Sequence, residues 1–286
     1  MTAETPTSLT MEARRRFHAA MIEKGLLTTN DQGVPSIADS SSPASKGVAT
    51  LLLAKIGSEA MGARLAGQSA GRGFEDFVRI FLTEIFPSLA HVRCGEFTIA
   101  AGGNISIYDQ YTHLTAVDRA VRSDTELRVA LGRDYIIRPD VVIYRSPVSD
   151  DVINATELVV DSHCAARTPL RASNNSDPIL HASVSCKWTI RSDRAQNARS
   201  EALNLIRNRK GKLPHIAVVT AEPMMSRIAS LALGTGDIDC VYHIALPELG
   251  EATMERGSED AQELFRMMTE GRRLRDISDL PFDLAI

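Results

Sequence analysis

The hydrophobic positions of this chain repeat with two periods, which predict helices followed by a group of strands. Apolar residues recur every three or four positions over residues 11–24 and again over residues 46–85, with an interruption by glycines between residues 67 and 73. Pro87 ends this helical pattern. Runs rich in Val, Ile and Tyr follow and predict strands, at residues 92–100, 135–144 and 179–190.

Helical and strand patterns alternate in the second half of the chain. The predicted elements there are a helix after Arg191, a strand at residues 215–220, a helix at 224–233 and a strand at 241–246. This order favours an α/β fold in which helices flank a mixed five-stranded sheet. The polar, irregular residues 149–178 indicate an insertion between two strands.

The length of 286 residues is compatible with one domain. We expect residues 1–90 to form a helical part packed on the core, residues 91–247 to contain the sheet and its functional helix, and residues 248–286 to form an acidic tail region. The content of 44% hydrophobic and 24% charged residues is that of an ordinary globular protein.

Targeting signals and cysteine patterns point to an intracellular protein. No apolar run approaches the roughly 20 residues that span a bilayer, and the N-terminus lacks the basic and apolar regions of a signal peptide. The four cysteines form no Cys-x-x-Cys pair, which predicts reduced thiols rather than a disulfide or zinc scaffold. We therefore predict a cytoplasmic protein without membrane contact.

Charge is distributed unevenly along the chain, although the net charge is only −4. Residues 191–212 contain seven basic and two acidic side chains, whereas residues 248–286 contain ten acidic side chains and five arginines. Patches further apart than a Debye length of roughly 8 to 10 Å act separately on a polyanion. A basic centre in an acidic protein predicts localised binding of nucleic acid rather than coating.

Three ionisable residues interrupt apolar segments. Asp140 follows Pro139 at the start of one predicted strand, Lys187 interrupts another, and Glu201 lies in the middle of the next helix. Burying such groups costs several kcal/mol unless they pair or bind a cation. Two carboxylates with a backbone carbonyl suit Mg²⁺, and a nearby ammonium can orient a water, which is the equipment of phosphodiester hydrolysis. A purely structural ion-pair cluster is the alternative.

The element order, with Pro139-Asp140 and Ser185-Cys186-Lys187, resembles the PD-(D/E)xK restriction-endonuclease-like core, in the variant where a glutamate of the next helix replaces the middle acid. Because Arg191-Ser192-Asp193-Arg194 follows closely, the chain is similar to the type II restriction endonucleases that read CCGG. The resemblance implies that Asp140 and Glu201 bind Mg²⁺, with two ions per active site. It also implies that the Cys186 backbone carbonyl completes the inner ligands, that Lys187 positions the water, and that Ser185 has only an outer role.

Base recognition is expected at the start of the helix that carries Glu201. Arginine makes paired hydrogen bonds to guanine O6 and N7, and a carboxylate accepts from cytosine N4. Arg191, Asp193 and Arg194 therefore suit adjacent G·C pairs. A solvated helix start with Arg/Asp ion pairs is the alternative. For the outer base pair Arg227 is the candidate, and it is equally suited to a phosphate contact or an exposed surface.

The resemblance further implies the site GCCGGC in double-stranded DNA, cut after the first G to leave 5′ overhangs. It implies a homotetramer built as a dimer of dimers in the bacterial cytoplasm, with a cognate DNA methyltransferase as its genetic partner. Two other functions stay open. One is a structure-selective repair or junction nuclease on the same core, and the other is a sequence-specific DNA-binding protein without catalysis.

One position departs from the family pattern. The family places a glutamate on the helix before the sheet, and our alignment puts Ala70 at that position. Glu75 is more than one turn further on, and we expect it to point elsewhere. The chain would then lack one outer carboxylate of the metal site and could be an activity-impaired variant.

Overall fold

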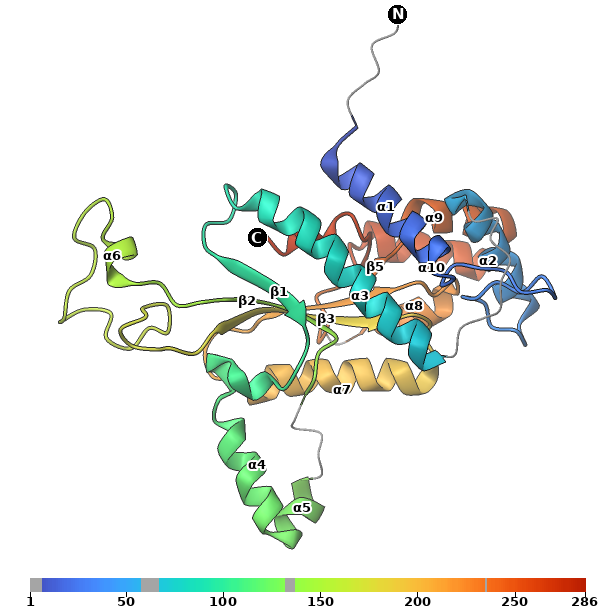
Figure 1. Ribbon diagram of the computed structural model, residues 1–286. Helices are drawn as coiled ribbons and strands as arrows, with labels where there is room; N and C mark the ends of the chain where they lie inside the picture. The colour runs from blue at the N-terminus through green and yellow to red at the C-terminus, as the bar shows by residue number, and fades with distance from the viewer. Residues whose placement is uncertain (1–6, 58–66, 132–136, 235) are drawn as a thin grey trace, which may run out of the picture.

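A six-stranded mixed sheet lies at the centre of the molecule (Figure 1), in a computed structural model that describes residues 7–57, 67–131, 137–234 and 236–286. The side chains of residues 67, 68, 131 and 192–194 also lie outside the description. The strands, in their order across the sheet, are β1 (Phe97–Ala101), β2 (Val141–Arg145), β3 (Ile179–Lys187), β4 (His215–Thr220), β5 (Cys240–His243) and β6 (Leu274–Asp276). The α/β fold with a mixed sheet is confirmed, and the sheet has one strand more than we predicted.

The direction of pairing changes at β3. Strands β1, β2 and β3 pair antiparallel, whereas β3 to β6 pair parallel. The seven inner residues of β3 are all buried, as are five of the six residues of β4. Strands covered on both faces need such continuous apolar runs, which is why the sequence pattern identified these two clearly.

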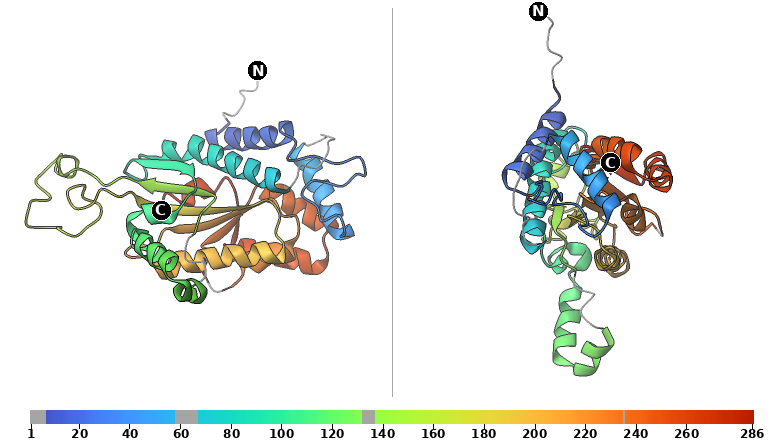
Figure 2. Two further views of the ribbon diagram at one scale, coloured as in Figure 1. Left: turned by 60° about the horizontal axis from the view of Figure 1, so that its bottom comes forward. Right: turned by 90° about the vertical axis from the view of Figure 1, so that its right-hand side faces the viewer.

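Helices cover both faces of the sheet, with α3 (Gly67–Ile85) and α7 (Ser192–Asn208) on opposite sides (Figures 1 and 2). Helix α1 (Leu9–Glu23) packs on the outside of α3. Phe74, Val78 and Phe81 occur at helical spacing in α3 and are buried against the core. The interruption expected between residues 67 and 73 does not occur, because α3 continues through these glycines.

Most of the other helices of the body lie in the C-terminal part of the chain, with one from the N-terminal part packed beside them. They are α2 (Pro43–Ile56), α8 (Met225–Ala232), α9 (Leu246–Arg256), α10 (Glu259–Glu270) and α11 (Leu280–Asp283). Helix α9 packs on α2, and α10 packs on α8. Residues 248–286, expected as an acidic tail region, thus contain helices and the sixth strand of the sheet.

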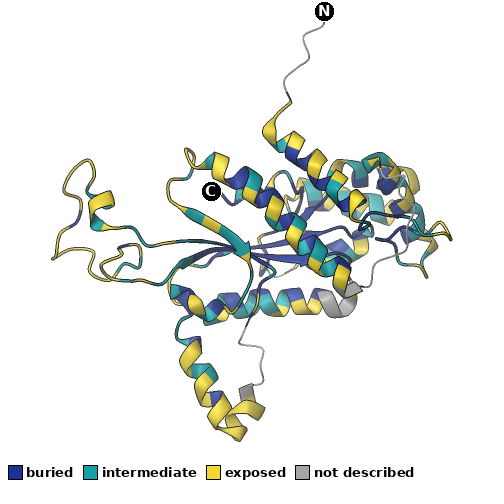
Figure 3. Cartoon of the chain, viewed as in Figure 1, coloured by how far each residue is buried: buried dark blue, intermediate teal, exposed yellow. Residues whose placement is uncertain are grey.

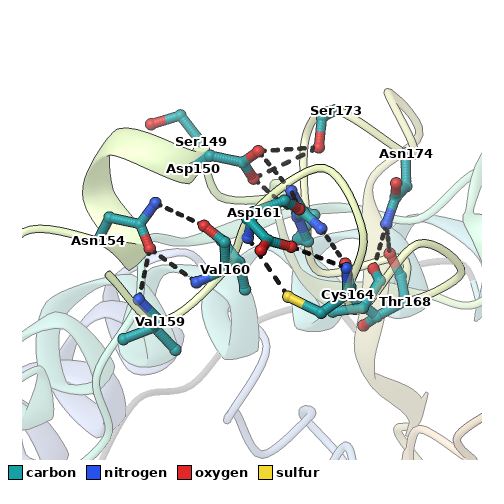
Figure 4. A network of polar contacts seen from close by, with 12 residues as sticks. Ser149, Asp150, Asn154, Val159, Val160, Asp161, Cys164, Thr168, Ser173 and Asn174 are labelled. Atoms are coloured by element: carbon teal, nitrogen blue, oxygen red, sulfur yellow. Dashed lines mark hydrogen bonds and ion pairs between the residues drawn. The ribbon is translucent and has the colours of Figure 1, made fainter. Parts of the chain in front are cut away.

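Two segments project from the body (Figure 1). Helices α4 (Leu114–Ser123) and α5 (Thr125–Leu131) form one projection, which the sequence pattern did not predict. The other is the insertion between β2 and β3, which contains the short helix α6 (Asp150–Ile153). Polar contacts hold this insertion together (Figure 4), among them an ion pair between Arg171 and Asp150 at 2.6 Å. The prediction of a polar, irregular insertion is confirmed.

Burial follows the layers (Figure 3): the central strands β3 to β5 and the inner sides of the covering helices are mostly buried, the edge strand β1 is partly exposed, and the two projections are mostly exposed. Three short 3-10 helices connect the elements: η1 (Phe86–Leu89), η2 (Ile105–Ile107) and η3 (Asp109–Tyr111). All four cysteines are free thiols, as predicted. Among the described residues, no helix has the length and apolar character needed to cross a membrane.

Candidate active site

A close approach of two backbones fixes Asp140 at the start of β2. The N–H of Gly102, just after β1, donates to the Asp140 carbonyl at 2.9 Å. A Cβ atom on Gly102 would lie 1.5 Å from the Pro139 carbonyl oxygen. Only glycine is compatible with this approach, so the position of the Asp140 backbone depends on Gly102.

Strand pairing places the end of β3 beside Asp140. Val141 pairs with Val184, so the residue before Val141 meets the residue after Val184, which is Ser185. The N–H of Cys186 donates to Asp140 Oδ2 at 2.7 Å. Since alternate strand residues share a face, Ser185 and Lys187 lie on one side of β3 and the buried Cys186 thiol lies on the other.

Helix α7 completes a group of four residues that we call the site cluster: Asp140, Ser185, Lys187 and Glu201. Lys187 Nζ lies 3.3 Å from Asp140 Oδ2 and 3.9 Å from Glu201 Oε2. Ser185 Oγ lies 3.5 Å from Asp140 Oδ2 and 3.4 Å from Glu201 Oε2. The structure therefore brings together the four side chains that the sequence singled out, from two strands and one helix.

In the site cluster, the positive charge of Lys187 only partly compensates the two carboxylates. Burial raises the pKa of Glu201, and the Asp140 carboxylate raises it further, while Lys187 opposes both only in part. Lys187 is the more enclosed partner, with 14% of its side chain exposed against 36% for Glu201. Burial also raises the pKa of the Cys186 thiol well above its usual range. That thiol is consequently a neutral core group, and only the backbone of Cys186 is available to the site.

Glu75, on α3, is coupled electrostatically to Asp140 and Lys187 of the site cluster. Burial raises the pKa of Glu75, and among the surrounding charges Asp140 raises it further while Lys187 lowers it. Ala70 lies five residues earlier and is buried in the hydrophobic core, with 5% exposed. This coupling makes Glu75 the candidate on α3 for the carboxylate that we expected to be missing at Ala70. The sequence expectation rested on the separation of Glu75 from Ala70 by more than one helical turn, which does not show how α3 lies on the sheet.

The donor set fits a hard divalent cation. Within the described part of the chain, no group of three or more His, Cys, Asp and Glu side chains is close enough to hold a metal by itself. The two carboxylates of the site cluster face each other across Ser185, and Glu75 adds further negative potential. With Lys187 as the cation in contact with both carboxylates, an additional positive charge would relieve their repulsion.

Two of the basic residues expected to read bases, Arg191 and Arg227, lie at one wide cleft. Arg191 is exposed at the N-cap of α7. A cleft of about 1030 Å³ is lined by Arg191 and also by Arg227 of α8. The side chains of Asp193 and Arg194 lie outside the described residues. Sequence spacing gave no sign that Arg191 and Arg227 would share a cleft.

Arg227 is held by two acids that the sequence did not point to. Its guanidinium hydrogen-bonds to Asp39, which lies 188 positions earlier in the chain, and approaches Glu222 Oε1 at 3.7 Å. Asp39 lies in a polar loop and Glu222 in the connection between β4 and α8, so neither belonged to a pattern that could have identified it.

Comparison with known proteins agrees with this geometry. Residues 17–286 match the model of a protein family described as NgoMIV restriction enzyme. The chain is 50% identical over 280 residues to the type II restriction enzyme NgoMIV of Neisseria gonorrhoeae. This alignment covers 96% of the chain and 98% of that protein.

Proposed function

The chain belongs to the family of the NgoMIV restriction enzyme and is a type II restriction enzyme, and from this premise we propose that it cuts double-stranded DNA at GCCGGC after the first G. The observation that carries the proposal is the position of Lys187, 3.3 Å from Asp140 and 3.9 Å from Glu201. It places a hydrolytic cluster four residues before Arg191, so cutting and reading share one segment of chain.

In this proposal Asp140 and Glu201 hold Mg²⁺, two ions per site, together with the Cys186 backbone carbonyl. The ions, when bound, supply Lewis acidity at the scissile phosphate. Lys187 donates a hydrogen bond to the attacking water and orients it. Ser185 Oγ can donate its one proton to either carboxylate, an outer role that its distances of 3.4 and 3.5 Å support.

In our proposal Glu75 supplies the outer carboxylate of the metal site that the family pattern led us to expect at the position of Ala70. Its raised pKa, due first to burial and then to Asp140, supports a position beside the metal site. We therefore propose an enzyme with a complete set of carboxylates rather than an impaired variant. Glu75→Gln should slow cleavage, whereas Ala70→Glu would bury a charge in the core and lower stability instead of raising activity.

Recognition in this proposal falls to Arg191, Asp193 and Arg194 for the CCGG core and to Arg227 for the outer pair. The exposure of Arg191 at a helix N-terminus and the cleft that it shares with Arg227 support these roles. A palindromic site requires a symmetric partner, so we propose a homo-oligomer, with a tetramer of two dimers as its final form. A bacterial cytoplasmic location and a cognate methyltransferase as genetic partner complete the proposal.

The test is incubation of a plasmid of known sequence with Mg²⁺, followed by mapping of every cut end. We expect discrete fragments whose 5′ overhangs begin after the first G of each GCCGGC. Cuts at other sites with a CCGG core would show that the enzyme recognises only the inner base pairs, and would refute recognition of the outer pair. Nicks only at branched or damaged DNA would favour a structure-selective nuclease. Specific binding without any cut would favour a DNA-binding protein without catalysis.

A further inference from the structure

A buried carboxylate outside the site cluster joins the two segments that carry Arg191 and Arg227. Glu222 lies in the connection between β4 and α8, and its side chain has no exposed surface. None of the steps of hydrolysis uses it. A fully buried acid is unfavourable unless its oxygens are satisfied, so the contacts that it makes indicate what it does.

Each oxygen of Glu222 serves one of the two segments. Oε2 accepts from the N–H of Ile190 at 2.8 Å, and Ile190 directly precedes Arg191. Oε1 accepts at 3.1 Å from the N–H of Met224, the N-cap residue of α8. The same oxygen lies 3.7 Å from Nη1 of Arg227, on the first turn of α8. A neutral side chain of equal size could not accept from both N–H groups and attract the guanidinium as well.

This connection also reaches the catalytic strand. Thr220, two residues before Glu222, pairs with Lys187 in the parallel register of β3 and β4. The Thr220 hydroxyl accepts from the N–H of Glu222 at 3.1 Å. Glu222 therefore connects the end of the strand that carries Lys187, the start of α7 and the start of α8.

The charge of Glu222 is costly and is only partly offset. Burial raises its pKa to about 7, opposed first by the N–H of Ile190 and then by Arg227. An apolar core would provide packing without this cost, but it would leave the N–H groups of Ile190 and Met224 without acceptors. This cost is consistent with Glu222 serving to fix the backbone at Ile190 and Met224 rather than to fill the core.

We propose that Glu222 is a positioning residue for sequence recognition, which fixes the backbone before Arg191 and the guanidinium of Arg227 relative to each other. The inference rests on the proposed function, since it assumes that both arginines read bases. Its consequence is that discrimination at the inner and outer base pairs is coupled through one carboxylate. A disturbance at Glu222 then affects both positions together.

The experiment compares Glu222→Gln with the unmodified enzyme by kcat/KM on oligonucleotide duplexes. The duplexes carry the mapped site, the site with one inner pair replaced, or the site with one outer pair replaced. Gln keeps the shape but offers one acceptor and no charge. We expect discrimination at both positions to fall at least about tenfold, since a good base contact discriminates by about one to two powers of ten.

The matched control is Asp276→Asn, because Asp276 is also a buried carboxylate that accepts from backbone N–H groups and pairs with an arginine, but it lies on the edge strand β6. Its hydrogen bonds and ion pairs in the described ranges of the chain include none with Ile190, Met224 or Arg227. The substitution should lower the Tm and leave both discrimination ratios unchanged. Unchanged ratios in Glu222→Gln would overturn the proposal and leave Glu222 a structural residue. Loss at the outer pair alone would overturn the coupling.

If Glu222→Gln does not fold, Glu222→Asp provides the same test, because it keeps the charge and both oxygens but shortens their reach. A smaller loss of discrimination at both positions is expected, and ratios within about twofold of the unmodified enzyme would refute the proposal. The result with the unmodified enzyme distinguishes a failure of the proposed function from a failure of the inference about Glu222. If it shows no preferred site, the proposed function fails, whereas a sharp preference that survives in the Glu222 variants refutes only this inference.

Discussion

The site cluster and a second cluster at the β6 edge of the sheet each place one cation between two carboxylates. The second, which we call the edge cluster, consists of Arg14 on α1, Glu248 on α9 and Asp276 on β6. Arg14 is buried and makes two hydrogen bonds to each carboxylate, at 2.6 to 3.0 Å. In the site cluster Lys187 makes one hydrogen bond of 3.3 Å, and its second acid is 3.9 Å away.

Each cluster has one cation and two carboxylates, yet the pKa values of their carboxylates shift in opposite directions. In the edge cluster burial by itself would raise the pKa of Glu248 and of Asp276, but the hydrogen bonds and charge of Arg14, together with further hydrogen bonds, lower both. In the site cluster burial prevails and the pKa of Glu201 is raised. A planar guanidinium satisfies two carboxylates at once, whereas a single ammonium does not. The edge cluster is complete by itself, and the site cluster is left to attract a further cation.

The largest expected effect is the loss of cleavage in Lys187→Ala. If Lys187 positions the attacking water, single-turnover cleavage should fall by about 10²- to 10⁴-fold. Specific DNA binding, measured by gel shift with Ca²⁺ in place of Mg²⁺, should stay largely intact. Loss of specific binding would instead place Lys187 in recognition or folding, and the contrast with Arg14 would disappear.

Arg14→Ala should have the largest effect on stability. It removes the cation from two enclosed carboxylates, which costs about 3 to 5 kcal/mol when one partner of a buried pair is lost. Urea unfolding measures this free energy, and cleavage per folded molecule should be unchanged. Arg14→Lys is the control. It keeps the charge but loses the forked geometry, so a stability equal to that of the unmodified protein would show that the geometry of Arg14 is not what distinguishes the clusters.

Addition of Ca²⁺ or Mg²⁺ tests the comparison without any change to the unmodified chain. A cation that binds the folded state alone stabilises it by about 2.7 kcal/mol at a concentration a hundred times its Kd. We expect the Tm to rise with metal concentration in the unmodified protein and in Asp276→Asn. In Asp140→Asn the rise should be absent, and an equal rise there would locate the metal away from the site cluster.

The contrast between the clusters also explains what the sequence could predict. Asp140, Lys187 and Glu201 were found because each interrupts an apolar run at a spacing that a known nuclease core requires. Strands β3 and β4 and helix α7 were found because their burial is continuous or has a clear helical period. In these places the local pattern and the tertiary structure agree.

The sequence failed where distant contacts decide the structure. Strand β6 has three residues and two charges, and Asp276 is stabilised there by Arg14 from 262 positions away. Glu75 was set aside because it lies more than one helical turn beyond Ala70, and the sequence does not display the packing of Phe74 against Trp188, which fixes how α3 lies on the sheet. Glu222 belongs to no pattern, since its partners are backbone N–H groups that the sequence does not display.

The smallest expected effect distinguishes the two clusters most directly, because the free energy of unfolding should change in opposite directions in them. A neutral amide in place of a carboxylate should destabilise the edge cluster and stabilise the site cluster. Asp276→Asn loses charge-assisted hydrogen bonds to Arg14 and should lower the free energy of unfolding. Glu201→Gln should raise it in the absence of metal, by less than about 1 kcal/mol because its side chain is 36% exposed and solvent screens its charge.

The pH dependence of Glu201→Gln identifies the cause of that gain. The pKa of Glu201 is raised above its ordinary value of 4.5, so between these two values the folded protein keeps a proton that the unfolded chain releases. The contribution of Glu201 to stability therefore falls as pH rises through this window, while Gln does not titrate. The advantage of the variant should be absent near pH 4 and complete at pH 8 when unfolding is followed in urea with EDTA. An advantage that is the same at both pH values would come from packing, and Glu201 would then not be an uncompensated charge.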